Sequence, residues 1–234
     1  MADLSEHAEA LAEAEAHLRA LGRPPLQPLP QGFATGREEL HRIAEHLLKP
    51  KRLLETGNEI ALRFTPGGFG TPRWEQGVES GLPGTARVEG TEIVIADGSE
   101  QKRTPIDVDP AISAAVADWF ALGTVALAGL IEAGADLDPE PIRLWPEHFD
   151  VATVLGDEAA GSRANFGASP GDEAHPEPYL YVGPWVEQPR GEIWNGVGFH
   201  GAELRYADLL ATDDQLSAAT RFFVSHLEAL SPGG

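Results

Sequence analysis

The sequence predicts an α+β fold in which helices pack on a mainly antiparallel β-sheet. Predicted strands and helices follow one another in blocks and not in strict βαβ alternation, which favours antiparallel pairing. A long apolar helix is predicted at residues 110–134 and an amphipathic helix at 212–230, and both are long enough to cover a sheet. We find no self-similar period that would indicate a duplicated unit.

The N-terminal segment is predicted to be a helix followed by a linker. Residues 3–21 are rich in Ala and Glu and place Leu11 and Leu18 on one apolar stripe. A Pro-rich stretch follows and breaks the helix. We therefore expect residues 1–31 to form a helix and linker beside a single domain at 32–234, with the helix packed on that domain or on a partner subunit.

Capping residues suggest where the other helices begin and end. A second helix is predicted at residues 35–55, with Thr35 as its N-cap, and Pro50 is expected to kink or end it. Pro110 suits the first turn of the long helix, and Thr212 is the expected N-cap of the last one.

Alternating apolar and polar residues, bounded by Gly, Pro and Asp, predict strands. The predicted strands lie at 58–64, at 85–99 as a hairpin that turns at Glu89 and Gly90, and at 142–145, 148–155, 162–169, 178–185 and 191–199.

Composition excludes several classes of site and partner. The chain has no Cys, which rules out disulfides, thiolate nucleophiles, zinc ribbons and iron–sulfur clusters. Its formal net charge of -20 repels phosphate backbones and anionic lipid surfaces, so we expect neither nucleic acid nor membrane as a partner. The first residues lack the pattern of a signal peptide, and Asp118 interrupts the most apolar stretch, so we expect a cytoplasmic protein with a buried core helix.

The glycine-rich segment TPGGFGTP at 65–72 follows a predicted strand, as a phosphate-binding loop would. It lacks the lysine and hydroxyl of a P-loop, so a structural loop is favoured. If it is functional, the amides of Gly67 and Gly68 would approach a ligand, with Arg73 as the counter-charge.

Two segments rich in His and carboxylates predict a candidate metal site. In LWPEHFD, His148 and Asp150 share one face of an extended chain. Carboxylate and imidazole ligands suit a divalent Mn, Fe, Zn or Mg ion, which would polarise a carbonyl or activate water. A hydrogen-bonded core histidine and an exposed acidic turn explain the same residues without a metal. The loop GDEAHPEPY supplies the remaining candidate ligands, which are Asp172, Glu173, His175 and Glu177.

Aromatic side chains concentrate in the second half of the chain. Tyr179, Tyr181 and Trp185 recur at a period of two or four residues along one predicted strand. Together with Trp145 they would form the wall of a pocket for an apolar or planar molecule, although core packing between the sheet and the C-terminal helix is the more frequent cause of aromatic residues there.

Three segments, LRFTPGGFGTP, LWPEHFDVA and NFGASPGDEAHPEPYLYVGPW, resemble an uncharacterised protein family of actinobacteria, which is loosely related to a broader bacterial domain of unknown function. The resemblance runs from about residue 36 to 230 and rests most specifically on Pro176, Glu177, Pro178 and Tyr179. It implies a bacterial cytoplasmic protein, and it implies no activity.

Three functional hypotheses follow. The first is a small-molecule-binding module with an aromatic-walled pocket. The second is a metal-assisted hydrolase or isomerase that uses the His and carboxylate residues above. The third is a homo-oligomeric scaffold without chemistry, in which the N-terminal helix mediates self-association.

Overall fold

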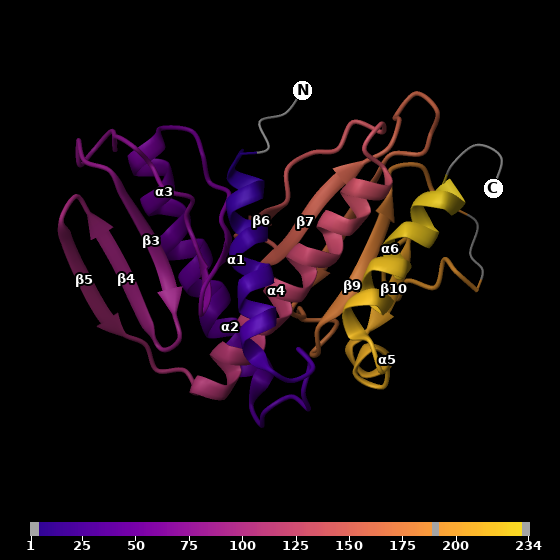
Figure 1. Ribbon diagram of the computed structural model, residues 1–234, viewed down its shortest axis with the longest axis horizontal. Helices are drawn as coiled ribbons and strands as arrows, with labels where there is room; N and C mark the ends of the chain where they lie inside the picture. Colours follow the sequence, from indigo (N-terminus) through magenta and orange to yellow (C-terminus); the bar gives the residue numbers. More distant parts are fainter. Residues whose placement is uncertain (1–4, 189–191, 231–234) are drawn as a thin grey trace.

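Two antiparallel sheets of five strands each form the middle layer of the molecule (Figure 1), as the sequence predicts for an α+β fold. The computed structural model describes residues 5–188 and 192–230. In both sheets, strands that are adjacent in the sequence are also neighbours in space. The first sheet contains β1 (Arg63–Thr65), β2 (Gly68–Gly70), β3 (Gly84–Glu89), β4 (Glu92–Asp97) and β5 (Glu100–Pro105). The second contains β6 (Arg143–Trp145), β7 (Asp150–Leu155), β8 (Ala164–Ser169), β9 (Tyr179–Pro184) and β10 (Ala202–Arg205).

A short bridge joins the two sheets edge to edge. The backbone N–H of Leu62 donates to the carbonyl of Leu144 at 2.8 Å, and the N–H of Leu144 donates back to Leu62, also at 2.8 Å. Both leucine side chains are buried. The ten strands therefore form one extended layer.

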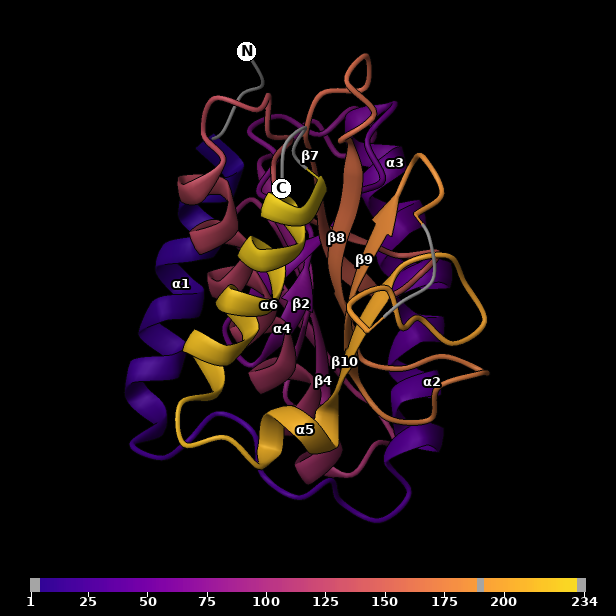
Figure 2. The same ribbon diagram turned by 90° about the vertical axis from the view of Figure 1, so that its right-hand side faces the viewer.

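Helices cover this layer on both faces (Figure 2). On one face lie α1 (Ser5–Leu21), α4 (Pro110–Ala133) and α6 (Gln215–Leu230), with α4 in the middle. On the other face lies a continuous helical segment made of α2 (Phe33–Ile43), the π-helical turn η1 (Ala44–Leu48) and α3 (Lys49–Thr56). A short helix, α5 (Tyr206–Leu210), follows β10.

The long helix α4 is the centre of the core. It begins where Asp109 accepts a hydrogen bond from the N–H of Ala111 at 2.8 Å, with Pro110 in the first turn as predicted. Trp119 and Phe120 are fully buried between the layers. Within the described part of the chain, α4 is the one helix long and apolar enough to cross a membrane, and 78% of its most apolar window is buried inside the molecule. This burial is typical of a core helix.

The N-terminal helix and the residues after it are fixed to α4 by polar contacts to the buried Asp118. Asp118 of α4 lies 2.7 Å from His17 Nε2 through one carboxyl oxygen and accepts a hydrogen bond from Arg23 at 2.7 Å through the other. The segment after α1 contacts the C-terminal part of the chain, since the hydroxyl of Tyr206 donates to the carbonyl of Gln27 at 2.7 Å. Of the residues expected to form the N-terminal helix and linker, those that the structure describes, 5–31, are thus packed against the rest of the chain.

The two halves of the chain repeat one order of elements, a helical segment followed by a five-stranded meander. Arg63, Pro66 and Phe69 recur 80 residues later as Arg143, Pro146 and Phe149. No self-similar period was found in the sequence, and these matches do not provide one. Three matching positions around one hairpin are too few to stand out as a period.

Several predicted boundaries were wrong. The second helix begins at Phe33, before the predicted cap Thr35. Burial of the Phe33 side chain stabilises the helical backbone at this end. Of the two outcomes expected at Pro50, a kink or an end, the end is wrong: the helix continues, because η1 widens the backbone just before the proline and spares it a clash in the preceding turn. At the last helix, Asp214 caps in place of Thr212, accepting from the N–H of Ser217 at 3.0 Å.

The strand predictions were wrong in several places. Of the predicted strand at 58–64 only the residues from Arg63 belong to β1, and β2 forms at 68–70, inside the segment expected to be a loop. The part of the 191–199 segment that is described forms no strand, and β10 follows it instead; residue 191 lies outside the described residues. The charged strand β5 was not predicted, because all its residues are exposed and show no alternation.

Candidate functional site

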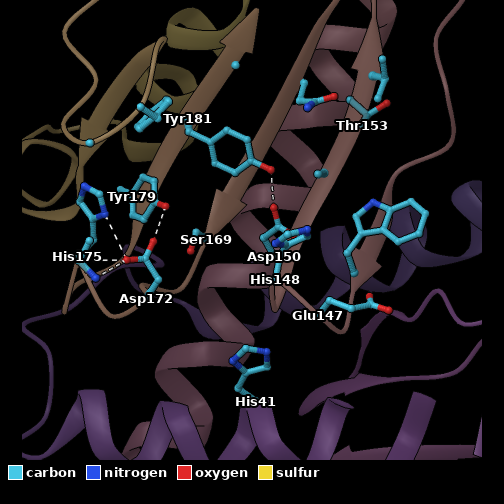
Figure 3. A pocket seen from close by; sticks show the side chains of 18 of the residues that line it. His41, Glu147, His148, Asp150, Thr153, Ser169, Asp172, His175, Tyr179 and Tyr181 are labelled. Atoms are coloured by element: carbon cyan, nitrogen blue, oxygen red, sulfur yellow. Dashed lines mark hydrogen bonds and ion pairs between the residues drawn. The ribbon is translucent and has the colours of Figure 1, made fainter. Parts of the chain in front are cut away.

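An open pocket of about 920 Å³ lies on the face of the second sheet that α2 partly covers (Figure 3). Strands β7, β8 and β9 form its floor. Because side chains alternate along a strand, each strand sends one set of residues toward α4 and the other toward the pocket. The pocket residues of these strands are Asp150, Ala152, Thr153 and Val154 on β7, Asn165 and Ser169 on β8, and Tyr179, Tyr181 and Gly183 on β9, and Thr153 is the exception to the alternation.

The turn between β6 and β7 presents two residues of the site. Phe149 has a positive φ of 53°, which a bulky residue adopts only when its surroundings hold it there. Its N–H donates to the carbonyl of Trp145 at 2.7 Å, and its ring is fully buried between Phe69 and Phe120. This conformation leaves His148 exposed and buries Asp150 at the start of β7.

The ring of His41, on α2, closes one side of the pocket. It stacks on Phe149 with 5.2 Å between ring centroids, and its Nε2 lies 3.0 Å from the carbonyl oxygen of Pro146. Burial lowers the pKa of His41, which favours the neutral ring.

Tyr181 and Asp150 form the deepest polar contact of the site. The Tyr181 side chain crosses from β9 over β8, and its hydroxyl donates a hydrogen bond to Asp150 on β7 (Figure 3). It crosses directly above Gly167, where a Cβ atom would overlap the tyrosine ring. The absence of a side chain at position 167 is therefore what allows the two residues to meet.

Asp150 is 5% exposed, and only one of its two carboxyl oxygens has a hydrogen-bond partner. One carboxyl oxygen accepts from Tyr181, and the other is buried without a hydrogen-bond partner. Burial raises the pKa of Asp150, against the smaller opposing effects of Tyr181 and His148. Burial and the neighbouring Asp150 carboxyl raise the pKa of Tyr181 well above its usual value, so the phenol remains protonated.

A second polar group lies at the next turn, between β8 and β9. Asp172 accepts hydrogen bonds from the N–H groups of Ala174 at 2.7 Å and His175 at 2.8 Å, which fixes the loop. Its other oxygen accepts from the Tyr179 hydroxyl at 2.7 Å. Although burial acts the other way, these hydrogen bonds together hold the pKa of Asp172 below its usual value.

His175 connects this turn to β10. Its Nδ1 lies 3.3 Å from Asp172, and its Nε2 lies 3.4 Å from the buried carboxylate of Glu203. Its ring packs on Tyr179 with 4.4 Å between centroids. Two tyrosine–aspartate pairs and a histidine held between two carboxylates therefore span four neighbouring strands.

The pocket is rich in carboxylates and poor in cations. Among the described residues that line it, none is Lys or Arg. Two lining carboxylates have a cation just outside, since Glu140 pairs with Arg163 at 2.8 Å and Glu147 with Lys49 at 2.6 Å. Asp150 has no such partner among the described residues. Apolar groups complete the walls, namely Ile60, Pro141, Trp145, Val197 and Phe199.

The six metal-ligand candidates do not converge. His148 and Asp150 line one part of the pocket and Asp172 and His175 another, while the loop residues Glu173 and Glu177 are exposed and outside it. In the described ranges 5–188 and 192–230, no three His, Asp or Glu side chains are grouped closely enough to hold a metal ion. The six candidates are therefore not brought together as one group in this structure, because the turns after β6 and β8 place the lining residues at different points of the pocket.

The ligand-wall candidates divide differently. Trp145, Tyr179 and Tyr181 line the pocket. Trp185 lies past the end of β9, is 49% exposed and donates from its indole N–H to Asn165 at 3.2 Å, so it does not line the pocket. Arg73 belongs to the first half of the chain, where it pairs with Glu75 at 3.4 Å and faces no pocket residue.

The glycine-rich segment at 65–72 has a structural role. Residues 68–70 form β2, and at Gly70 a Cβ atom would overlap the side chain and backbone of β3. The bare backbone faces a neighbouring strand and not a ligand.

Sequence reasoning missed several pocket residues. The alternation of Asn165, Gly167 and Ser169 on β8 was a signal for the site, because small residues every second position leave room above a sheet. His41, Glu140 and Phe199 come from distant segments and gave no local signal.

Comparison with known proteins identifies no relative: no family model, no curated protein and no solved structure matches this chain.

Proposed function

We propose that this protein is a small-molecule-binding module whose ligand occupies the pocket on β7, β8 and β9. The observation that supports the proposal most is the half-satisfied carboxyl of Asp150 beside an open pocket. A buried polar atom without a partner is costly to the fold, and such atoms concentrate where a ligand supplies the missing contact.

Pocket size and composition support the same proposal. A volume of about 920 Å³ lies within the range of pockets that hold small organic molecules. Apolar walls combined with a few fixed polar groups are typical of such sites. The metal-assisted hydrolase receives no comparable support, because its six candidate ligands are dispersed.

A pocket-filling variant tests the proposal. Gly183 lies on the pocket floor with an ordinary φ, and the nearest atom to a built Cβ is the Asn165 Cβ at 4.0 Å. A Cβ atom at position 183 therefore meets no clash, and Gly183→Leu extends a larger side chain from there into the pocket. We expect fragments found by ligand-observed NMR to bind the wild type and to lose at least about tenfold in affinity in this variant.

Gln101→Leu is the matched control, because Gln101 is an exposed strand residue on β5, far from the pocket. It should leave fragment binding unchanged. Equal binding by the wild type and by Gly183→Leu would refute the pocket as the ligand site.

A further inference from the structure

We propose that the pocket selects a small organic cation, a primary or secondary ammonium attached to an apolar or aromatic group. This inference rests on the proposed binding function and names the chemical class of the ligand. It is carried by the unpaired carboxyl oxygen of Asp150, by the absence of Lys and Arg among the described lining residues, and by the apolar walls.

Charge excludes the opposite class. An anion entering the pocket would meet the carboxylates of Glu140, Glu147, Asp150 and Asp172 without a lining Lys or Arg to offset them. A cation would meet Asp150. Of these four carboxyl groups, Asp150 alone lacks both a neighbouring Lys or Arg among the described residues and a full set of hydrogen bonds. Because Asp150 is shielded from water, its attraction for a positive group is weakly screened.

Hydrogen-bond geometry narrows the class further. A guanidinium binds a carboxylate best through two parallel N–H donors, which need both oxygens. Tyr181 already occupies one oxygen of Asp150. A single free oxygen therefore matches an ammonium, which acts as a compact point charge.

On this proposal, a ligand reaches the free oxygen past His148. This oxygen is covered from solvent, and His148 lies beside Asp150 in Figure 3. His148 is exposed, so its side chain can turn without disturbing the core. Trp145 and Phe199 then provide the apolar surface for the rest of the ligand.

Three probes of similar shape test the inference: benzylamine, which is cationic at neutral pH, benzyl alcohol, which is neutral, and benzoate, which is anionic. Calorimetric titration at pH 7.5 with the wild type should show benzylamine binding about tenfold tighter than benzyl alcohol, with no binding of benzoate. Asp150→Asn keeps an acceptor for Tyr181 and removes the charge, so it should abolish the preference for benzylamine. Gly183→Leu should weaken benzylamine and benzyl alcohol alike.

The outcomes separate the two proposals. If benzyl alcohol or benzoate binds as tightly as benzylamine, and Gly183→Leu weakens both, the pocket stands and the cationic class is refuted. If benzylamine binds equally to the wild type, Asp150→Asn and Gly183→Leu, the cation is held by the general negative charge of the protein and the inference is overturned.

If no probe binds the wild type, the inference is overturned, and fragment screening against Gly183→Leu decides the proposed function by itself. Near-ultraviolet circular dichroism of each variant establishes that it is folded.

Discussion

At the scale of single residues, the site depends on a glycine and on two aspartates with opposite electrostatic environments. Gly167 lets Tyr181 cross β8 and reach Asp150. Asp150 is buried with an unpaired oxygen, whereas Asp172 is held by backbone and phenol donors. Substitutions at these three positions are therefore expected to change stability in different ways.

Gly167→Ala should displace the Tyr181 ring and break its contact with Asp150. Overpacking of this kind costs about 1–3 kcal/mol in the free energy of unfolding, measured by urea denaturation. Gly183→Ala is the matched control on the adjacent strand, because a Cβ there has open space. It should change the stability by no more than about 0.5 kcal/mol. Equal stability of the two alanine variants would show that Tyr181 does not lie across Gly167.

Asp150→Asn and Asp172→Asn should change the stability of the fold relative to the wild type in opposite directions as the pH rises. The folded pKa of Asp150 is raised, so its ionisation costs stability as the pH rises from the unfolded pKa, near 4, through the folded pKa. Asparagine removes this cost, so Asp150→Asn should gain stability relative to the wild type as the pH rises from about 3 to 7.

The folded pKa of Asp172 is lowered, so its contribution is present above the unfolded pKa and is lost as the pH falls through the folded pKa. Asp172→Asn should therefore lose stability relative to the wild type as the pH rises over the acid range, between about 2 and 5. Urea midpoints of the three proteins across these pH values check both signs. Parallel curves for the two variants would contradict the assignment.

At the scale of elements, α1 is held to the core by charge as well as by packing. The carboxyl of Asp118 on α4 contacts His17 and Arg23 and is 5% exposed. Asp118→Asn preserves shape and removes the negative charge that pairs with Arg23. It should destabilise the fold by about 1–3 kcal/mol and accelerate amide hydrogen exchange in α1.

Asp208→Asn is the control for this prediction, because Asp208 forms an exposed ion pair with Arg205 at 3.0 Å. Exposed pairs contribute little, so stability should change by less than about 1 kcal/mol. Unchanged exchange in α1 of Asp118→Asn would show that apolar packing alone holds the helix.

Elements with a strong local pattern could be predicted from sequence. The core helix α4 is continuous and apolar, and the strands β6, β7, β8 and β9 alternate between turns, so the α+β class followed. The strand β5 could not be predicted, since its pairing with β4 and not its own pattern defines it. The turn at Phe149 depends on distant rings from β2 and α4, which no local signal encodes.

The sequence indicated which segments contribute residues to the pocket, but it did not indicate how close together those residues lie. His148, Asp150, Asp172 and His175 line one pocket, yet they fall into two separate groups, because the turns after β6 and β8 place them at different points of the floor. Spacing along the chain gives the face of a strand and does not give the distance between strands. The lining residue His41 lies on a helix more than 100 residues earlier and depends entirely on the tertiary fold.

At the scale of the whole molecule, the two halves share one order of elements, but the sheet face that α2 and α3 cover differs between them. In the first half, α3 lies over Trp74, whose ring is 5.6 Å from the Lys51 ammonium, and Glu55 is buried against Ser80. In the second half, β7, β8 and β9 extend past α2 and leave the pocket open (Figures 2 and 3). We therefore place the ligand site on the second sheet, where His41 and Ile60 are the lining residues that come from the first half of the chain.

The most direct test of this account is an NMR titration of the ¹⁵N-labelled wild-type protein with benzylamine at low salt and again at 0.5 M NaCl. The account predicts saturable shifts in the amides of Ala152, Gly167, Tyr181 and Gly183 that persist at high salt, with β3, β4 and β5 unaffected. Shifts spread over the acidic surface that disappear with salt, or shifts centred on the first sheet, would contradict it.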